Sequence, residues 1–192
     1  MADIKIDTNQ NAIIINEFDE PSVKTFREQF QKLYDDDMVP IIPIYIDSYG
    51  GGVYSLLALI DIIEGFSCRK PIATIALGKA MSCGGLLLAV GSPGYRFAGP
   101  NSTIMIHQVS SMSWGTLSEM KNNLKEVERL NNLLFKKLDD RCKKKAGYWS
   151  ALLKKNDHTD LFLTANQSKK HGLIDQVGLP QFEQKQVVRI LL

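Results

Sequence analysis

Apolar and polar residues alternate in two different patterns along the first third of the chain. Short β-branched runs predict strands at 12–15 and 39–46, and the second run is apolar almost throughout, as in strands buried on both faces of a parallel sheet. Between them, apolar residues at helical spacing predict a helix over 21–34. Its core-facing residues are Val23, Phe26, Phe30 and Leu33. This alternation of strand and helix predicts an α/β layered fold.

The same alternation continues to the end of the chain. A glycine-rich loop at 48–52 leads into a predicted helix at 53–64, which Gly65 ends. A buried strand at 72–77 leads into a short apolar helix that begins after Ser82. Further strands are predicted at 95–97, 103–106 and 173–177, and a short helix at 164–171 ends at Gly172.

One predicted helix is much longer than the others. From residue 117 to about 145, apolar residues fall on one stripe: Leu117, Met120, Leu124, Val127, Leu130, Leu134 and Leu138. At 1.5 Å per residue this helix is about 40 Å long, more than a compact body of this size needs. We therefore expect it to project from a single domain spanning 1–192, with a partner subunit covering part of it.

Composition narrows the class of protein. The chain has 192 residues, 44% of them hydrophobic and 23% charged, and a net charge of +2, so no nucleic-acid partner is expected. Its three cysteines have no metal-like spacing, and no metal or organic cofactor is expected. With no signal-peptide pattern and no apolar run long enough to cross a bilayer, we expect a cytoplasmic protein without a membrane partner.

Ser82 is the first candidate for chemistry. It lies among small residues, Gly78 to Gly85, where a buried strand passes into a buried helix. A hydroxyl at a helix N-terminus sits beside unpaired main-chain N–H groups, which can stabilise an oxyanion. The alternative is that Ser82 serves only as the N-cap of that helix. His107 ends the predicted strand 103–106, where a histidine can also be a structural hydrogen-bonding residue.

Four segments, in this order, resemble the ClpP family of serine peptidase subunits. They are Tyr45-Ile-Asp-Ser-Tyr-Gly-Gly51, then Gly78 to Gly85, then Arg96-Phe-Ala-Gly-Pro-Asn-Ser102 with Met105-Ile-His-Gln108, and last Asp160-Leu-Phe-Leu-Thr-Ala165 with Gly172-Leu-Ile-Asp175. The resemblance implies the ClpP/crotonase fold, a spiral of ββα units, in which the helix at about 117–145 is the handle that joins two rings.

The resemblance also assigns a role to each candidate residue. Ser82 becomes the nucleophile, His107 the general base that takes its proton, and Asp160 the acid that orients the imidazole. For Asp160 the alternative is a surface carboxylate, because the segment 154–159, with Asp157, departs from the family's usual spacing. His158 and His171 have no matching context and are expected at the surface.

Main-chain groups are implied around the nucleophile. The oxyanion hole is expected from the N–H groups of Gly51 and Cys83, with Gly52 as an alternative donor because the chain has three consecutive glycines. Substrate is expected to pair as an added strand beside Gly50, Gly52, Gln108 and Val109. The segment after His107 has Ser, Met and Trp where the family has paired glycines.

Two neighbouring side chains suggest other chemistries. The Cys83 thiol is a possible nucleophile, although the sequence favours the interpretation that Cys83 is a small buried packing residue. Lys79, three residues before Ser82, invites a Ser/Lys dyad, which is a minor alternative.

The activity implied by the resemblance is that of a serine endopeptidase. It would cut unfolded polypeptides through an acyl-enzyme, inside a chamber built from two stacked seven-membered rings, with a Clp ATPase as partner. Compared with the family, the segment before Ala12 is short. The alternatives are a structural ring subunit that cuts little and a crotonase-type acyl-CoA enzyme, which shares the fold.

Overall fold

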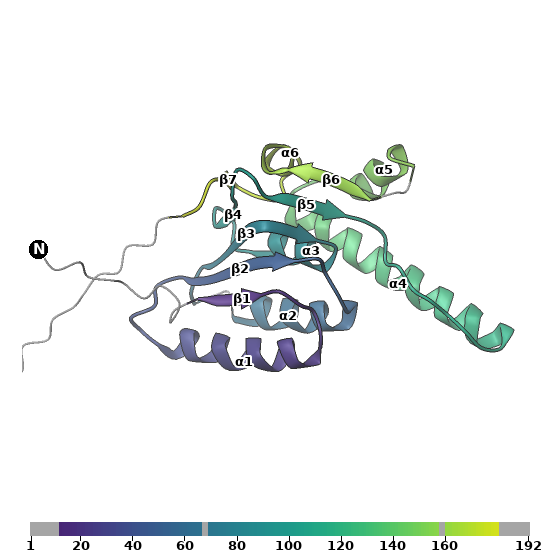
Figure 1. Ribbon diagram of the computed structural model, residues 1–192, viewed down its shortest axis with the longest axis horizontal. Coiled ribbons are helices and arrows are strands. Elements are labelled where there is room, and N and C mark those ends of the chain that lie inside the picture. Colours follow the sequence, from purple (N-terminus) through teal and green to yellow (C-terminus); the bar gives the residue numbers. More distant parts are fainter. Residues whose placement is uncertain (1–11, 67–68, 158–159, 181–192) are drawn as a thin grey trace, which may run out of the picture.

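The computed structural model describes residues 12–66, 69–157 and 160–180, and it contains a seven-stranded sheet with helices packed on it (Figure 1). The elements, in chain order, are β1 (Ile13–Ile15), α1 (Glu20–Asp35), β2 (Ile42–Ser48), α2 (Val53–Phe66), β3 (Ile72–Met81), α3 (Cys83–Val90), β4 (Arg96–Ala98), β5 (Thr103–Ile106), α4 (Leu117–Arg141), α5 (Tyr148–Lys155), β6 (Leu161–Thr164), α6 (Ala165–His171) and β7 (Gln176–Val177). The α/β fold expected from the sequence is confirmed.

The sheet has a parallel main path with a fork at β3. Strands β1, β2, β3, β4 and β7 are neighbours in that order and run parallel. The long strand β3 pairs with β4 through Thr74–Ala76 and with β5 through Lys79–Met81. Strand β6 then adds to β5 in the antiparallel direction. The carboxyl ends of β2, β3 and β5 therefore meet at one edge, beside the start of β6.

Helices α1 to α4 contact one another in chain order, and the core lies between them and the sheet. Helix α1 begins where Asp19 accepts a hydrogen bond from the Ser22 N–H, as a good N-cap does. Its Phe26 and Phe30 are almost fully buried. On the other sheet face, the described residues form a small apolar cluster around Ile75 and Phe97. Tyr45 of β2 is partly exposed there, so among these residues burial on both faces is incomplete.

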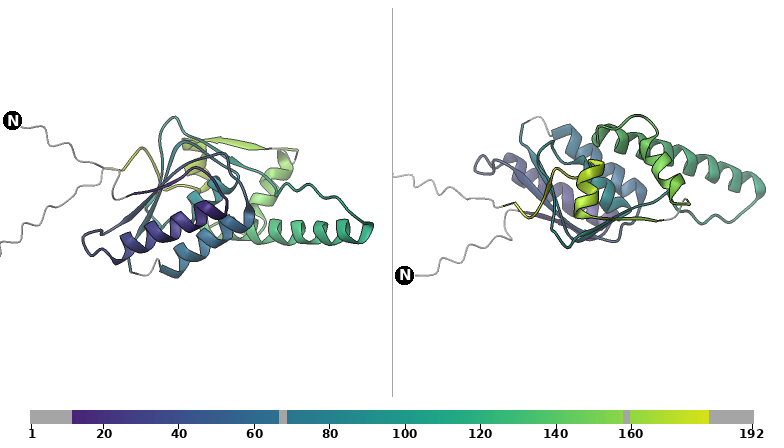
Figure 2. Two further views of the ribbon diagram at one scale, coloured as in Figure 1. Left: turned by 60° about the horizontal axis from the view of Figure 1, so that its bottom comes forward. Right: turned by 90° about the horizontal axis from the view of Figure 1, so that it is seen from above.

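Helix α4 projects beyond the carboxyl ends of the strands (Figures 1 and 2). A capping box at Thr116 starts it, and its buried residues lie in its second half, from Leu130 to Asp139. In the first half, Leu117 and Leu124 are 65% and 59% exposed. The projecting helix is as predicted, but it ends at Arg141 and not near residue 145.

A second helix follows that the sequence interpretation did not include. Lys143 takes a left-handed conformation with φ 54°, which ends α4, and α5 starts after Gly147. The buried Asp139 carboxylate accepts hydrogen bonds from the N–H groups of Gly147 and Trp149, and so ties the two helices together.

Two strands near the end of the chain also differ from the prediction. The antiparallel strand β6 was not predicted, and β7 covers only Gln176–Val177 where a strand at 173–177 was expected. The Leu173 N–H bonds to the Ser168 carbonyl and closes the end of α6, so residue 173 belongs to a helix cap. Gly172 is left-handed, as expected for the residue after a helix.

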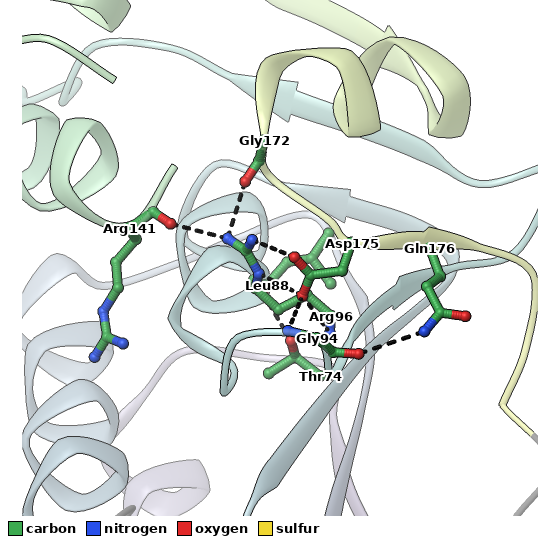
Figure 3. A network of polar contacts seen from close by, with 8 residues as sticks. All are labelled: Thr74, Leu88, Gly94, Arg96, Arg141, Gly172, Asp175 and Gln176. Carbon is green, nitrogen blue, oxygen red and sulfur yellow. Dashed lines mark hydrogen bonds and ion pairs between the residues drawn. The ribbon is translucent and has the colours of Figure 1, made fainter. Parts of the chain in front are cut away.

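An ion pair between the buried Arg96 and the partly buried Asp175 joins the end of the sheet to two helix ends (Figure 3). The Arg96 guanidinium binds both carboxylate oxygens of Asp175 and also donates to the carbonyls of Arg141 and Gly172. Burial raises the pKa of Asp175, but the hydrogen bonds from Arg96 and from the Gly94 N–H outweigh it and hold that pKa below its usual value.

Among the helices of the described ranges, none is long and apolar enough to cross a membrane.

Candidate active site

Ser82 lies in a strained turn between β3 and α3. Its φ of 54° and ψ of −119° are rare for a residue with a side chain, and such strain often marks a functional site. The turn is held because the Ser82 N–H donates to the Met105 carbonyl at 2.8 Å. The hydroxyl makes no capping hydrogen bond to α3, so the N-cap alternative does not describe what the side chain does.

His107 lies beside this hydroxyl. Because Met81 pairs with Met105 in the parallel register, the residues that follow β3 and β5 emerge next to each other. The His107 Nε2 is 2.7 Å from the Ser82 Oγ, a full hydrogen bond. With the proton on Nδ1, the Nε2 atom is the acceptor that a serine proton needs.

Asp160 reaches the other ring nitrogen of His107. In the antiparallel ladder Ile106 pairs with Leu161, so the next pair outward is His107 and Asp160. The Nδ1 to Oδ1 distance is 3.8 Å, within ion-pair range but longer than a hydrogen bond. The Asp160 side chain is 53% exposed, and Asn156 donates to its carbonyl oxygen. Asp157 makes no ion pair with His107 and lies in the turn after α5.

The glycine loop touches the nucleophile directly. A Cβ built on Gly50 would lie 2.7 Å from the Ser82 Cβ, and Gly50 has φ 115°, so only glycine fits there. The Gly50 N–H donates to the buried Ser48 Oγ at 3.0 Å. The Gly52 N–H donates to the Phe18 carbonyl at 2.7 Å.

Two main-chain donors near Ser82 remain without a partner among the described residues. The Gly51 N–H makes no hydrogen bond to a described residue, whereas the Gly52 N–H already donates to the Phe18 carbonyl. The first intrahelical bond of α3 runs from the Leu86 N–H to the Ser82 carbonyl, so the Cys83 N–H has no acceptor within the helix. These two groups are the donors expected for an oxyanion, and Gly52 is the less suitable of the two glycines.

The Cys83 side chain is not arranged as a nucleophile. Its thiol is buried and donates to the Gly51 carbonyl at 3.3 Å. Burial raises the pKa of this thiol, so the thiolate that a thiol mechanism requires is disfavoured. The contact instead fixes the Gly51 peptide against the start of α3.

Lys79 is also unsuited to be the base. Its ammonium group lies 2.6 Å from Asp47 and 4.5 Å from the centroid of the Tyr49 ring. The hydrogen bond to Asp47 raises the pKa of Lys79, which keeps it protonated. A Ser/Lys dyad is therefore not supported.

The remaining expected residues are placed as follows. Gln108 is exposed, but the Val109 N–H already donates to the Oδ1 of Asn131 on α4. His171 is partly buried and its Nδ1 makes a hydrogen bond with the Tyr148 hydroxyl, so it is less exposed than the surface position expected for it. Desolvation and nearby lysines lower its pKa. His158 lies outside the described residues.

Sequence reasoning gave no role to Ser48 and Asn131, which support the site. Ser48 carried a usable signal, a polar residue ending a buried strand just before the glycines. Asn131 carried a weaker one, because it is a polar residue on the apolar stripe of the long helix, four residues after Val127 and three before Leu134. A serine and a histidine in contact beside free main-chain donors can perform acyl transfer.

Comparison with known proteins agrees with this chemistry. A family model described as Clp protease matches residues 5–181. The ATP-dependent Clp protease proteolytic subunit 2 of Mycobacterium tuberculosis (strain ATCC 25618 / H37Rv) is 35% identical over 161 residues, covering 83% of this chain and 72% of that protein. The subunit 2 of Frankia casuarinae is 35% identical over 84% of this chain and 71% of its own length.

A third relative is the proteolytic subunit 1 of Rhodococcus jostii, 36% identical over 71% of this chain and 60% of its own. The family model spans nearly the whole chain, and the relatives align over most of it. The chain therefore belongs to the Clp protease family, a family of peptidases.

Proposed function

We propose that this chain is a serine endopeptidase that uses Ser82, His107 and Asp160. The observation that carries the proposal is the 2.7 Å contact between the Ser82 Oγ and the His107 Nε2, at a strained turn beside two free main-chain donors. A serine hydroxyl is a weak nucleophile until a base takes its proton, and this contact supplies the base.

In the acylation step the Ser82 Oγ bonds to the carbonyl carbon of the scissile peptide while its proton passes to the His107 Nε2. The N–H groups of Gly51 and Cys83 stabilise the oxyanion of the tetrahedral intermediate. The imidazolium then gives its proton to the departing amine, and an acyl-enzyme remains. Water attacks the ester, with His107 again as the base, and releases a carboxylic acid and free Ser82.

Asp160 stabilises the imidazolium that forms in both steps. The 3.8 Å separation from Nδ1 is longer than a hydrogen bond, and such contacts commonly shorten when substrate is bound. A positive charge on the ring draws the carboxylate closer, because it strengthens the attraction between them. Asp160 also selects the tautomer with a proton on Nδ1, which leaves Nε2 free to accept.

The substrate is an extended polypeptide that lies across Ser82 as an added strand. The loop at Gly50 to Gly52 bounds it on one side and the segment from Gln108 on the other. The Val109 N–H is used by Asn131, so of the two residues expected there, Gln108 and Val109, Gln108 is the one whose N–H is available. No metal or organic cofactor takes part in the proposed reaction.

We propose that residues 1–192 form one peptidase domain, with α4 as its handle, and that copies of it assemble. The exposed apolar residues of α4, Leu117, Met120 and Leu124, support a covering partner on this helix. The relatives are named as proteolytic subunits of ATP-dependent proteases. On that basis the assembly is two stacked seven-membered rings that enclose the active sites, with a Clp ATPase unfoldase as partner. Sizing the purified protein by light scattering tests the assembly.

Labelling with a fluorophosphonate tests the nucleophile. The intact protein should be modified at Ser82 in a stoichiometric manner, Ser82→Ala should not react, and His107→Ala should react at least about a hundredfold more slowly. Ser150→Ala, an exposed serine on α5, is the matched control and should behave like the parent. An assembled particle that neither labels nor cleaves a fluorogenic peptide would instead indicate a structural ring subunit. The Clp protease match favours a peptidase over an acyl-CoA enzyme. Binding of CoA in a direct assay would count against the peptidase proposal.

A further inference from the structure

The segment between β5 and α4 turns back along α4 and is fixed to it at two points. The Val109 N–H donates to the Asn131 Oδ1 at 2.8 Å, and the Asn123 Nδ2 donates to the Ser113 Oγ at 2.8 Å. The earlier segment residue, Val109, contacts the later helix residue, Asn131, and the later segment residue, Ser113, contacts the earlier helix residue, Asn123. The segment and the helix therefore run in opposite directions, side by side.

The spacing of these two contacts fits an extended segment. Eight residues of helix rise about 12 Å, at 1.5 Å per residue. Four residues of chain span at most about 13–14 Å. An extended stretch from Val109 to Ser113 therefore matches the distance between the two contacts along the helix.

In an extended chain the main-chain groups of successive residues point to opposite sides. Since the Val109 N–H faces α4, the main-chain groups of Gln108 and Ser110 face away from the helix. Both residues are exposed, and their N–H and carbonyl groups make no hydrogen bond to the described residues. They form a short, ready edge for an added strand, beginning one residue after His107.

We propose that Asn131 is a positioning residue for peptide binding, which holds this edge straight through the Val109 N–H. The inference rests on the proposed function, in which substrate pairs with this segment. His107 is fixed separately, by strand β5 and by its own contact with Ser82, so the loss of Asn131 affects the peptide edge and leaves the nucleophile activated. The hydrogen bond between Val109 and Asn131 is partly buried, whereas the one between Asn123 and Ser113 is exposed, so Asn131 is the stronger of the two attachments.

The test compares three variants of the full-length protein. Asn131→Leu removes the acceptor, Asn131→Asp keeps an oxygen in the same place, and Asn132→Leu makes the same change one residue along, at an exposed position. Two rates are measured for each: cleavage of a fluorogenic peptide that reaches past the scissile bond on both sides, and labelling of Ser82 by a small fluorophosphonate that has no peptide main chain.

For Asn131→Leu we expect the peptide KM to rise about tenfold, the effect of losing one partly buried hydrogen bond, while the labelling rate stays within about twofold. Asn131→Asp should keep KM within about threefold of the parent, and Asn132→Leu should change neither quantity. An unchanged KM in Asn131→Leu would overturn the proposal, and so would a labelling rate that falls as much as peptide cleavage does. Failure of the parent protein to label at all would refute the proposed function instead, so the two failures are distinct.

Discussion

Replacing Gly50 by alanine should disable the nucleophile while leaving the fold intact. The added Cβ would lie 2.7 Å from the Ser82 Cβ and 3.1 Å from its Oγ, whereas ordinary contact begins near 3.4 Å. Ser82 or the loop must then move by about 0.7 Å, and misplacement of a reacting group by about 1 Å can cost on the order of a hundredfold in rate. We therefore expect kcat/KM of Gly50→Ala to fall about a hundredfold.

Backbone strain alone must be separated from this collision. Gly50 has φ 115°, so any side chain there costs about 1–3 kcal/mol of folding free energy apart from its contacts. Gly178 provides the matched control, because its φ is 123° and an added Cβ would meet nothing within 4 Å. Gly178→Ala should lower the melting temperature by an amount similar to that of Gly50→Ala and keep full activity.

The assay is peptide cleavage and fluorophosphonate labelling of both variants, with thermal melts followed by circular dichroism. Labelling is informative because it reports on Ser82 without requiring a bound peptide strand. Retention of more than about a third of the parent rate by Gly50→Ala would show that the loop does not press on Ser82 as argued. A comparable loss of activity in Gly178→Ala would show that destabilisation, and not the collision, is the cause.

Three further substitutions test separate parts of the site and fold. Asp160→Asn should lower kcat by about 10²–10³-fold, because the carboxylate stabilises the imidazolium. The melting temperature should not change, because this exposed side chain contributes little to folding. An unchanged kcat in peptide-cleavage assays would exclude the role. Cys83→Ala removes only the thiol contact with the Gly51 carbonyl, so kcat should fall less than about tenfold. Mass spectrometry of the fluorophosphonate-labelled variant should still locate the adduct on Ser82. Asp175→Asn weakens the charged hydrogen bonds with Arg96 and should cost about 2 kcal/mol of unfolding free energy at neutral pH. Because the folded-state pKa of Asp175 is lowered, the difference between variant and parent in urea titrations should disappear as the pH falls through that pKa, and a constant difference would contradict the argument.

The positions of Ser82 and His107 could be predicted from the sequence because both follow buried strands. The apolar pattern marks these strands clearly, and the carboxyl ends of neighbouring parallel strands meet at one edge of a sheet. Asp160 is different, because it precedes β6, which has only four residues and exposes Phe162 and Thr164. So short a run with mixed burial gives no reliable strand signal.

The break between α4 and α5 was missed for a related reason. Lysine favours helices, so the run from Lys143 to Lys145 extended the predicted helix, although Lys143 in fact takes φ 54°. The apolar pairs Tyr148–Trp149 and Leu152–Leu153, four residues apart, were the available sign of a new helix. The partner of Asn131 could not be predicted, because it is set by the path of a segment without regular structure.

The three proposed catalytic side chains are anchored unequally, and this has a consequence for how the activity is controlled. Ser82 is held from both sides, by Met105 and by α3, and His107 follows a strand with two neighbours. Asp160 precedes a strand that pairs with β5 alone and is itself half exposed. Its separation from the imidazole, 3.8 Å, is the longer of the two contacts in the proposed triad. Because edge strands are the least constrained parts of a sheet, we expect the Asp160 carboxylate to change position most readily of the three, and the efficiency of the proposed triad to depend on how firmly β6 is held.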